Sequence, residues 1–216
     1  MPNAVILANG TPPSRATLKD ALRRATLFVC ADGGTDSARR YGMIPNAIVG
    51  DLDSISEESL ATFREIPIVP NTDTEHTDSE KAVEWILAQG SFEEIILLGA
   101  SAGRLDHVLG HLSLLHRYRG RVRIVLEDDH MRAWLASTGE EPIDAPVGTT
   151  ISFFAVGAPA EGVTTVNLRY PLVNRRIELG AQDSISNVVD ATPASIRIGS
   201  GELVVVVVRQ EASPEP

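Results

Sequence analysis

The sequence of 216 residues has one cysteine, fewer basic than acidic residues and no long apolar run. Cys30 alone cannot form an internal disulfide, and one thiol does not make a zinc cluster without several other ligands. The 19 lysines and arginines stand against 29 acidic residues, a net charge of −10. This balance argues against binding to nucleic acid or to anionic membranes, because nucleic-acid binding needs a basic face. The longest aliphatic run, Leu203 to Val208, is far shorter than the ~20 residues of a membrane helix.

The amino-acid composition of this chain is neither strongly apolar nor strongly charged. Hydrophobic residues make up 43% and charged residues 22%, which is typical of a globular protein and excludes a largely disordered one. No lysine or arginine precedes Arg15, so the basic start of a signal peptide is missing and we expect a cytoplasmic protein. The length fits one large domain or two small ones.

The first 130 residues alternate short apolar runs with helical patterns. Leu105, Val108, Leu109, Leu112 and Leu115 are spaced for one face of a helix. A second helix begins after Thr77 with Glu80 at capping-box spacing, and Gly90 ends it. Continuous apolar runs are typical of strands covered on both faces, and six occur: Ala4–Ala8, Leu27–Ala31, Ala47–Val49, Ile66–Val69, Ile95–Leu98 and Val122–Leu126. The alternation predicts an α/β domain with a mainly parallel sheet.

The helical patterns stop after about Asp129, and segments of β type follow. These are Met131–Ala136, Thr149–Val156, Val163–Leu168, Arg175–Leu179, Ile185–Val189 and Ala194–Arg209. The last of them contains Gly199-Ser200-Gly201, which predicts a hairpin with a glycine-rich turn. We therefore expect two domains, an α/β domain over residues 1–130 and an all-β sandwich over residues 131–216.

Aspartates gather at the ends of the expected strands and at the starts of the expected helices. Asp32 follows one strand, Asp51 and Asp53 follow the next, and Asp78 and Asp106 begin helices. The carboxyl ends of parallel strands face one crevice, where ligands of open α/β sheets bind. Carboxylates held close together repel one another unless a cation neutralises them, and hard oxygen ligands favour Mg²⁺. The sequence therefore predicts a magnesium site, and such a site usually shares the ion with substrate phosphates.

Each of these acids also has a structural explanation. Asp78 and Asp106 can complement the helix macrodipole, and Asp32, followed by two glycines, can belong to a simple turn. Asp51 and Asp53 are harder to explain in this way, since two carboxylates beside a glycine rarely serve packing. All four acidic segments together favour the metal site.

The segment Gly99-Ala-Ser-Ala-Gly103-Arg104 is a turn of small residues that leads into a helix. Backbone N–H groups at such a helix start bind phosphate, and a cation stands beside them here. The segment is not a Walker loop, because the Gly-Lys-Ser/Thr ending is missing. His107 and His111 are four residues apart on the same helix, but without a glutamate beside His107 a surface or packing role is the better interpretation.

The order of these motifs resembles the thiamine pyrophosphokinase family over nearly the whole chain, from Asn9-Gly10 onward. The matching segments are Ala31-Asp-Gly-Gly34, Gly50-Asp-Leu-Asp-Ser-Ile55, Thr77-Asp78 with Glu80 and Lys81, Gly99–His107, Leu168-Arg-Tyr-Pro-Leu172 and Ser184-Ile-Ser-Asn187. The resemblance implies an α/β domain followed by a β-sandwich, which agrees with the division above. It also implies a homodimer with active sites at the subunit interface.

The implied reaction transfers the β,γ-pyrophosphoryl group of ATP to the hydroxyethyl oxygen of thiamine and releases AMP. Carried over by position, the resemblance assigns residues to three tasks. Asp51, Asp53, Asp78 and Asp106 would hold or organise Mg²⁺; Lys81 and Arg104 would contact phosphates, with Asp32 also on the nucleotide side; and Tyr170, Ser186 and Asn187 would face thiamine.

This chain departs from the family pattern at two places. Relatives carry Lys-Asp or Gln-Asp where Thr74-Glu75 stand here, which bears on the nucleotide contact, and some carry tryptophan at the position of Tyr170. Two other functions stay open. One is a phosphoryl enzyme of haloacid-dehalogenase type, although that family has Gly-Thr where Ser54-Ile55 follow the second aspartate. The other is a non-catalytic nucleotide- or thiamine-binding module of the same fold.

Overall fold

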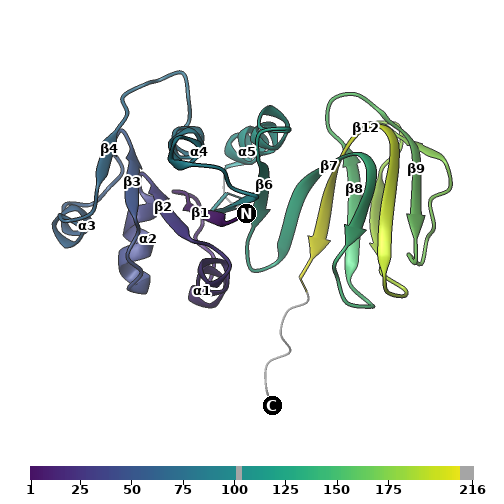
Figure 1. Cartoon of the computed structure of the whole chain (residues 1–216), viewed down its shortest axis with the longest axis horizontal. Coiled ribbons are helices and arrows are strands. Elements are labelled where there is room, and N and C mark those ends of the chain that lie inside the picture. Colours follow the sequence, from purple (N-terminus) through teal and green to yellow (C-terminus); the bar gives the residue numbers. More distant parts are fainter. Residues whose placement is uncertain (101–103, 210–216) are drawn as a thin grey trace, which may run out of the picture. The chain divides into compact units, whose positions relative to one another are not determined.

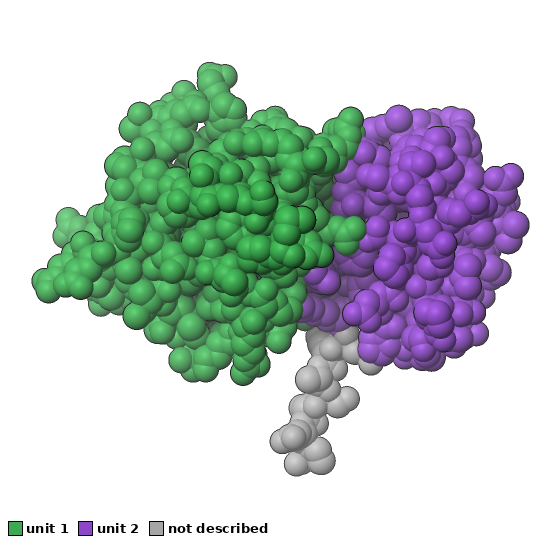
Figure 2. All heavy atoms as spheres, viewed as in Figure 1, with its two compact units in different colours: residues 1–129 green, residues 130–216 purple. Residues whose placement is uncertain are grey.

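The computed structural model describes residues 1–100 and 104–209 and divides into two compact units, Met1–Asp129 and His130–Pro216 (Figure 2). The first unit alternates strands with helices, whereas the second is built of strands. Among the described residues, no helix combines the length and the apolar character that crossing a membrane requires.

The first unit is an open parallel sheet with helices between its strands (Figure 1). The strands are β1 (Asn3–Leu7), β2 (Leu27–Ala31), β3 (Ala47–Gly50), β4 (Ile68–Pro70), β5 (Glu94–Leu98) and β6 (Arg123–Glu127). The helices are α1 (Arg15–Arg23), α2 (Gly34–Tyr41), α3 (Glu57–Thr62), α4 (Asp78–Gln89) and α5 (Leu105–Arg117). The predicted α/β organisation of this half is confirmed.

The order of strands in this sheet creates a binding edge. The sheet runs β4-β3-β2-β1-β5-β6, and every pair of neighbours is parallel. The chain therefore builds one half outward from β1 to β4 and then returns to the other side of β1 for β5. At such a reversal in strand order a crevice opens beyond the carboxyl ends of the strands.

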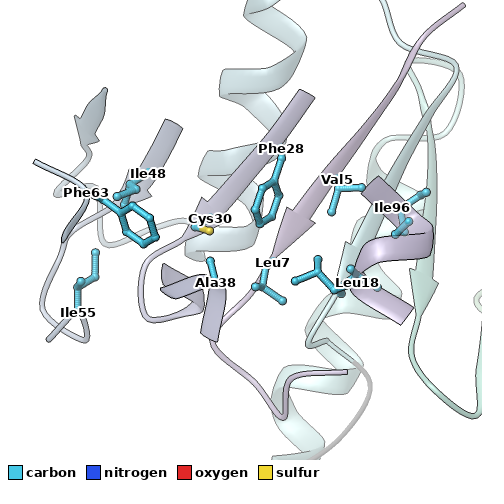
Figure 3. Close-up of a cluster of buried hydrophobic side chains, with 12 residues drawn as sticks. Val5, Leu7, Leu18, Phe28, Cys30, Ala38, Ile48, Ile55, Phe63 and Ile96 are labelled. Atoms are coloured by element: carbon cyan, nitrogen blue, oxygen red, sulfur yellow. The ribbon is translucent and has the colours of Figure 1, made fainter. Parts of the chain in front are cut away.

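Helices cover both faces of this sheet, which explains the continuous apolar strands. On one face α1 and α2 enclose a cluster that includes Val5, Leu18, Phe28, Cys30 and Ile48, all at most 5% exposed (Figures 1 and 3). On the other face α4 packs against β1, β2 and β3. Because the strands are fixed from both sides, the loops at their carboxyl ends start from rigid positions.

The first turn of α4 is set by local sequence. The Thr77 hydroxyl accepts a hydrogen bond from the Glu80 N–H at 3.3 Å, as a helix N-cap does, and Gly90 ends the helix. The Glu80 carboxylate contacts Arg117 of α5. The cap thus forms as the spacing predicts, and it places Asp78 at the first position of the helix.

The second unit is an antiparallel arrangement built around two long strands, β7 (Met131–Ile143) and β12 (Ala194–Val208). β9 (Ala160–Val166) pairs with the first part of β12, and β8 (Thr150–Ala155) pairs with its last part. β10 (Arg175–Ile177) extends the sheet beside β9, and β11 (Ser184–Val188) extends it beside β8. Sharing β12 between two sets of partners produces the expected β-sandwich.

The predicted hairpin at Gly199-Ser200-Gly201 is wrong, because β12 continues through these residues as one strand. The register between β12 and β7 shifts between Ile198 and Glu202, so the glycines mark a bulge. A Cβ atom at Gly201, where φ is +87°, would lie 2.6 Å from the Pro159 carbonyl oxygen. The glycine allows this close approach of two backbones and does not reverse the chain.

Candidate active site

A cavity of about 680 Å³ lies in the first unit beyond the carboxyl ends of β1, β2, β3 and β5. Ala8 and Gly99 line it directly after β1 and β5, at the reversal in strand order. A Cβ atom on Gly99, where φ is +71°, would lie 2.7 Å from the Ala8 carbonyl oxygen, so only glycine lets these two loops approach so closely. Both the position and the size fit a small-molecule site.

Three carboxylates converge in this cavity. One oxygen each from Asp32, Asp51 and Asp78 can be chosen so that all three lie within 4.8 Å of one another. Asp32 follows β2, Asp51 follows β3 and Asp78 is the first residue of α4, so three separate elements contribute. A Cβ atom on Gly50 would lie 3.0 Å from the Asp32 Cβ and 3.3 Å from Asp78 Oδ1. Glycine at this position therefore lets the acids gather; we call these three residues the acidic trio.

The electrostatics of the acidic trio call for a cation. Burial raises the pKa of Asp32, the Asp78 charge raises it further, and hydrogen bonds from Ser54 and Gly33 work in the opposite direction. Lys81 Nζ lies 3.0 Å from Asp78 Oδ1, and its side chain is 4% exposed. One ammonium group against three carboxylates leaves excess negative charge. The donor set of carboxylate oxygens from three elements fits a divalent cation such as Mg²⁺.

The other two predicted metal ligands line the same cavity but lie outside the trio. Asp53 Oδ1 accepts a hydrogen bond from the Ser54 hydroxyl at 2.9 Å. Asp106 forms a two-point pair with Arg104, with Nε–Oδ1 at 3.1 Å and a terminal nitrogen to Oδ2 at 2.5 Å. The Arg104 guanidinium lowers the pKa of Asp106 to about 2. The structure thus groups Asp32, rather than Asp53 or Asp106, with Asp51 and Asp78.

The expected phosphate segment Gly99–Arg104 is described only in part, because residues 101–103 lie outside the described residues. Arg104 is the N-cap residue of α5, is exposed and lines the cavity. Lys81 points its ammonium at Asp78 instead. Of the two predicted phosphate contacts, Arg104 therefore lies at the cavity wall. Lys81 does not line the cavity, and its ammonium group contacts Asp78 of the trio.

The three residues predicted to face thiamine come together in the second unit. Asn187 is 2% exposed, and its amide bonds the Tyr170 backbone in both directions, with Tyr170 N–Oδ1 at 3.1 Å and Nδ2–Tyr170 O at 2.7 Å. The Tyr170 side chain is 62% exposed. Ser186 is exposed too, at a left-handed φ of +57°, and its N–H donates to the Ser152 hydroxyl at 3.0 Å. Asn187 holds the segment that presents Tyr170.

The structure also brings Ser79 and His111 to the cavity wall. From the sequence, a surface or packing role is expected for His111, and Ser79 is not identified. Their side chains lie 3.1 Å apart, between Ser79 Oγ and His111 Nε2. The spacing of His107 and His111 drew attention to the helix but not to this partner, 32 residues away in the chain. Only the packing of α5 beside α4 brings the two together.

In comparisons with known proteins, both units match models of the same protein family. Residues 18–126 match the family described as thiamin pyrophosphokinase, catalytic domain, and residues 140–203 match thiamin pyrophosphokinase, vitamin B1 binding domain. The chain is 33% identical over 216 aligned positions to thiamine pyrophosphokinase 1 of Oryza sativa subsp. japonica, with 87% of this chain and 80% of the relative covered.

Solved structures agree at the level of the fold. The crystal structure of thiamine pyrophosphokinase from Bacillus subtilis has a TM-score of 0.87 at 26% identity, covering 96% of this chain and 99% of that one. Thiamin pyrophosphokinase from Candida albicans has the same TM-score at 19% identity, covering 96% and 89%. Since the family models match both units and the relatives align over most of their length, this chain belongs to the thiamin pyrophosphokinase family.

Proposed function

We propose that this chain transfers the pyrophosphoryl group of ATP to the hydroxyethyl oxygen of thiamine, giving thiamine diphosphate and AMP. Membership of the thiamin pyrophosphokinase family supports the reaction and its two substrates. The observation on this chain that carries the proposal is the acidic trio inside the cavity at the carboxyl edge of the sheet. A site built of carboxylates suits a nucleotide only together with a cation.

Asp32, Asp51 and Asp78 would hold Mg²⁺, with Asp53 and Asp106 close by on the cavity wall. When bound, the ion offsets the negative charge of the phosphates of ATP. Lys81 keeps the Asp78 carboxylate in place through their 3.0 Å contact.

On the phosphate side, Arg104 and the start of α5 would meet the triphosphate. The N-terminus of a helix presents free N–H groups and a partial positive charge to an anion. The Arg104 guanidinium already holds a two-point contact with the Asp106 carboxylate, and the same fork fits a phosphate. Pyrophosphoryl transfer needs in-line positioning and charge stabilisation more than covalent chemistry from the protein. The hydroxyl proton of thiamine would leave toward one of the aspartates of the cavity.

The second unit would supply the thiamine side, so that residues 1–130 bind ATP and Mg²⁺ and residues 131–216 bind thiamine. Thiamine has a cationic thiazolium ring, and a cation over an aromatic face is stabilised by roughly 0.5–2 kcal/mol. The exposed ring of Tyr170 offers such a face, and the Ser186 hydroxyl offers a polar partner. Asn187 would act on thiamine through Tyr170, whose backbone it bonds.

The proposal includes a homodimer with its active sites at the subunit interface. Exposed apolar side chains support a partner surface: on α5, which contributes to the cavity wall, Leu105 is 70% and Leu109 is 55% exposed. Analytical ultracentrifugation tests this part, and we expect a species of two 23.2 kDa chains. A single-chain species at assay concentrations would contradict it. We also propose a cytoplasmic location, and cell fractionation would test it.

The function is tested by AMP release from ATP, measured with thiamine and Mg²⁺ supplied together and with each omitted. We expect AMP only when both are present, and release that is nearly abolished in an Asp51→Asn control. A phosphatase of haloacid-dehalogenase type would release inorganic phosphate without thiamine. A non-catalytic binding module would bind ATP or thiamine in calorimetry and release no AMP. Either result would replace the proposed function.

A further inference from the structure

A buried serine–histidine pair lies beside the acidic trio. Ser79 Oγ is 3.1 Å from His111 Nε2, and His111 Nδ1 is 2.9 Å from the carbonyl oxygen of Ala100. Ser79 is 5% exposed and His111 is 8% exposed, yet both line the cavity. Two polar side chains that are withdrawn from solvent and bonded to each other fix the relative position of the segments that carry them.

The direction of each hydrogen bond follows from the partners. A carbonyl oxygen only accepts, so His111 Nδ1 carries the proton and donates to Ala100. The neutral ring then has a lone pair on Nε2, and that atom accepts the hydrogen bond of the Ser79 hydroxyl. Burial, opposed by the bond to Ala100, lowers the pKa of His111 and favours this neutral form.

The pair joins three segments of the cavity wall. Ser79 is the second residue of α4 and directly follows Asp78 of the acidic trio in the sequence. Ala100 follows β5, next to Gly99, and His111 belongs to α5. The metal side of the cavity and its phosphate side are therefore tied to each other through one imidazole ring.

We infer that Ser79 and His111 are positioning residues, which hold Asp78 in the geometry of the acidic trio by fixing the first turn of α4 to α5 and to the segment after β5. The identification of the trio as a cation site rests on the proposed function. Groups that orient metal ligands typically alter metal affinity by about 10–100-fold when removed. Ser79 acts one residue away from the ligand, so we expect a loss of about five- to ten-fold, at or below the lower end of that range.

The test uses Mn²⁺ alone as the probe, titrated into the full chain and followed by electron paramagnetic resonance, with no nucleotide present. Ser79→Ala removes the hydroxyl and should weaken Mn²⁺ binding, whereas Ser79→Thr keeps the hydroxyl and should restore it. The matched control is Ser113→Ala on α5, whose exposed hydroxyl donates to the Leu109 carbonyl oxygen at 3.0 Å. This control should bind Mn²⁺ like the wild-type protein.

A second variant addresses the other end of the bond. His111→Asn can still donate toward Ala100 but is too short to reach Ser79. If the pair acts as a unit, the double variant Ser79→Ala/His111→Asn weakens Mn²⁺ binding no more than Ser79→Ala alone. Losses of Mn²⁺ affinity that add in the double variant would contradict the inference, as would a lower melting temperature of Ser79→Ala at unchanged Mn²⁺ affinity.

Failure of this inference and failure of the proposed function give different results. Wild-type chain that releases AMP, together with Ser79→Ala that binds Mn²⁺ normally, overturns only the role of the pair. Wild-type chain that binds Mn²⁺ but releases no AMP, with a weakened Ser79→Ala, overturns the proposed function and keeps the pair. Wild-type chain that binds no Mn²⁺ overturns the inference.

Discussion

Asp51 and Asp53 are separated by one residue, yet the fold directs their carboxylates to different neighbours. Leu52 between them has a φ of +72°, a left-handed conformation that costs a residue other than glycine about 1–3 kcal/mol. The Leu52 side chain packs against the buried cluster beneath the sheet, and this contact offsets the strain. As a result Asp51 joins Asp32 and Asp78, while Asp53 bonds Ser54.

This difference predicts unequal effects of two matched substitutions. Asp51→Asn should lower kcat by about 100-fold or more, because a neutral amide is a poor ligand for a divalent cation. Asp53→Asn should have an effect about ten-fold smaller, since that carboxylate lies outside the trio. Steady-state kinetics over a range of Mg²⁺ concentrations measure both, with melting curves to confirm folding. Equal losses of kcat would show that Asp53 is as important as Asp51.

Arg104 is predicted to act on ATP and not on thiamine. Charge-assisted hydrogen bonds contribute about 1.5–3 kcal/mol, so Arg104→Ala should lower kcat/KM for ATP by at least about ten-fold. Arg104→Lys should restore part of it, because a point charge does not reproduce the two-point contact of a guanidinium. KM for thiamine should hardly change in either variant. Unchanged kinetics for ATP in Arg104→Ala would remove this residue from the site.

Tyr170 and Asn187 allow a contact role to be separated from a supporting one. Tyr170→Ala should raise KM for thiamine far more than KM for ATP and leave the melting temperature unchanged, because the ring is exposed. Asn187→Ala should raise KM for thiamine and also lower stability by about 1–3 kcal/mol, because backbone groups lose their partner. Kinetics with each substrate varied in turn, alongside melting curves, test both.

A packing role for Tyr170 would give a different result. Tyr170→Ala would then lower the melting temperature and affect both substrates equally. Tyr170→Trp, which keeps an aromatic face, should bind thiamine at least as well as the wild-type chain.

For individual side chains, the sequence indicates which residue types meet but not which particular residues do. The positions of Asp32, Asp51 and Asp78 after strands and at a helix start point to one crevice. Asp53 lies outside the trio next to Leu52, whose φ of +72° no pattern of residue types specifies. The bond between Ser79 and His111 depends on how two helices pack, so spacing along the chain contains no signal of it.

Among helices and strands, the strands covered on both faces are the most predictable from sequence. The expected strand Leu27–Ala31 coincides with β2. The expected strand Ala47–Val49 is one residue shorter than β3, and the expected strand Ile95–Leu98 is one residue shorter than β5. The second unit was harder to predict. β7 continues through Pro142 to Ile143, beyond the expected end at Ala136, because β12 runs beside it over the whole length. Pairing between distant segments, rather than local composition, sets these ends.

Two helix caps allow the link between helix stability and metal binding to be tested. Thr77 caps α4 beside the acidic trio, and Ser14 caps α1, where its hydroxyl accepts from the Thr17 N–H at 3.3 Å. Replacing either by alanine should cost about 0.5–2 kcal/mol of stability. Only Thr77→Ala should also raise the Mg²⁺ concentration needed for half-maximal activity, because its helix begins with Asp78. Melting curves and Mg²⁺ titrations measure the two effects, and equal Mg²⁺ dependence in both variants would contradict the link.

The whole chain has a net charge of −10, yet in the proposed reaction it binds the anion ATP. Long-range attraction does not help, so ATP binding would depend on local positive charge: the cation that the acidic trio would hold, the Arg104 guanidinium and the start of α5. This explains why the site lies at the carboxyl edge of a parallel sheet, where rigid strands deliver acids from several loops to one cavity.

In the proposed reaction the two terminal phosphates of ATP move together, in one transfer, to thiamine. ATP radiolabelled in its γ-phosphate tests this directly, in the presence of Mg²⁺ and thiamine, with the products separated by chromatography. We predict that the label appears in thiamine diphosphate, with one AMP formed for each labelled product and no ADP. Label in thiamine monophosphate accompanied by ADP, or label in inorganic phosphate, would rule out a single transfer of both phosphates.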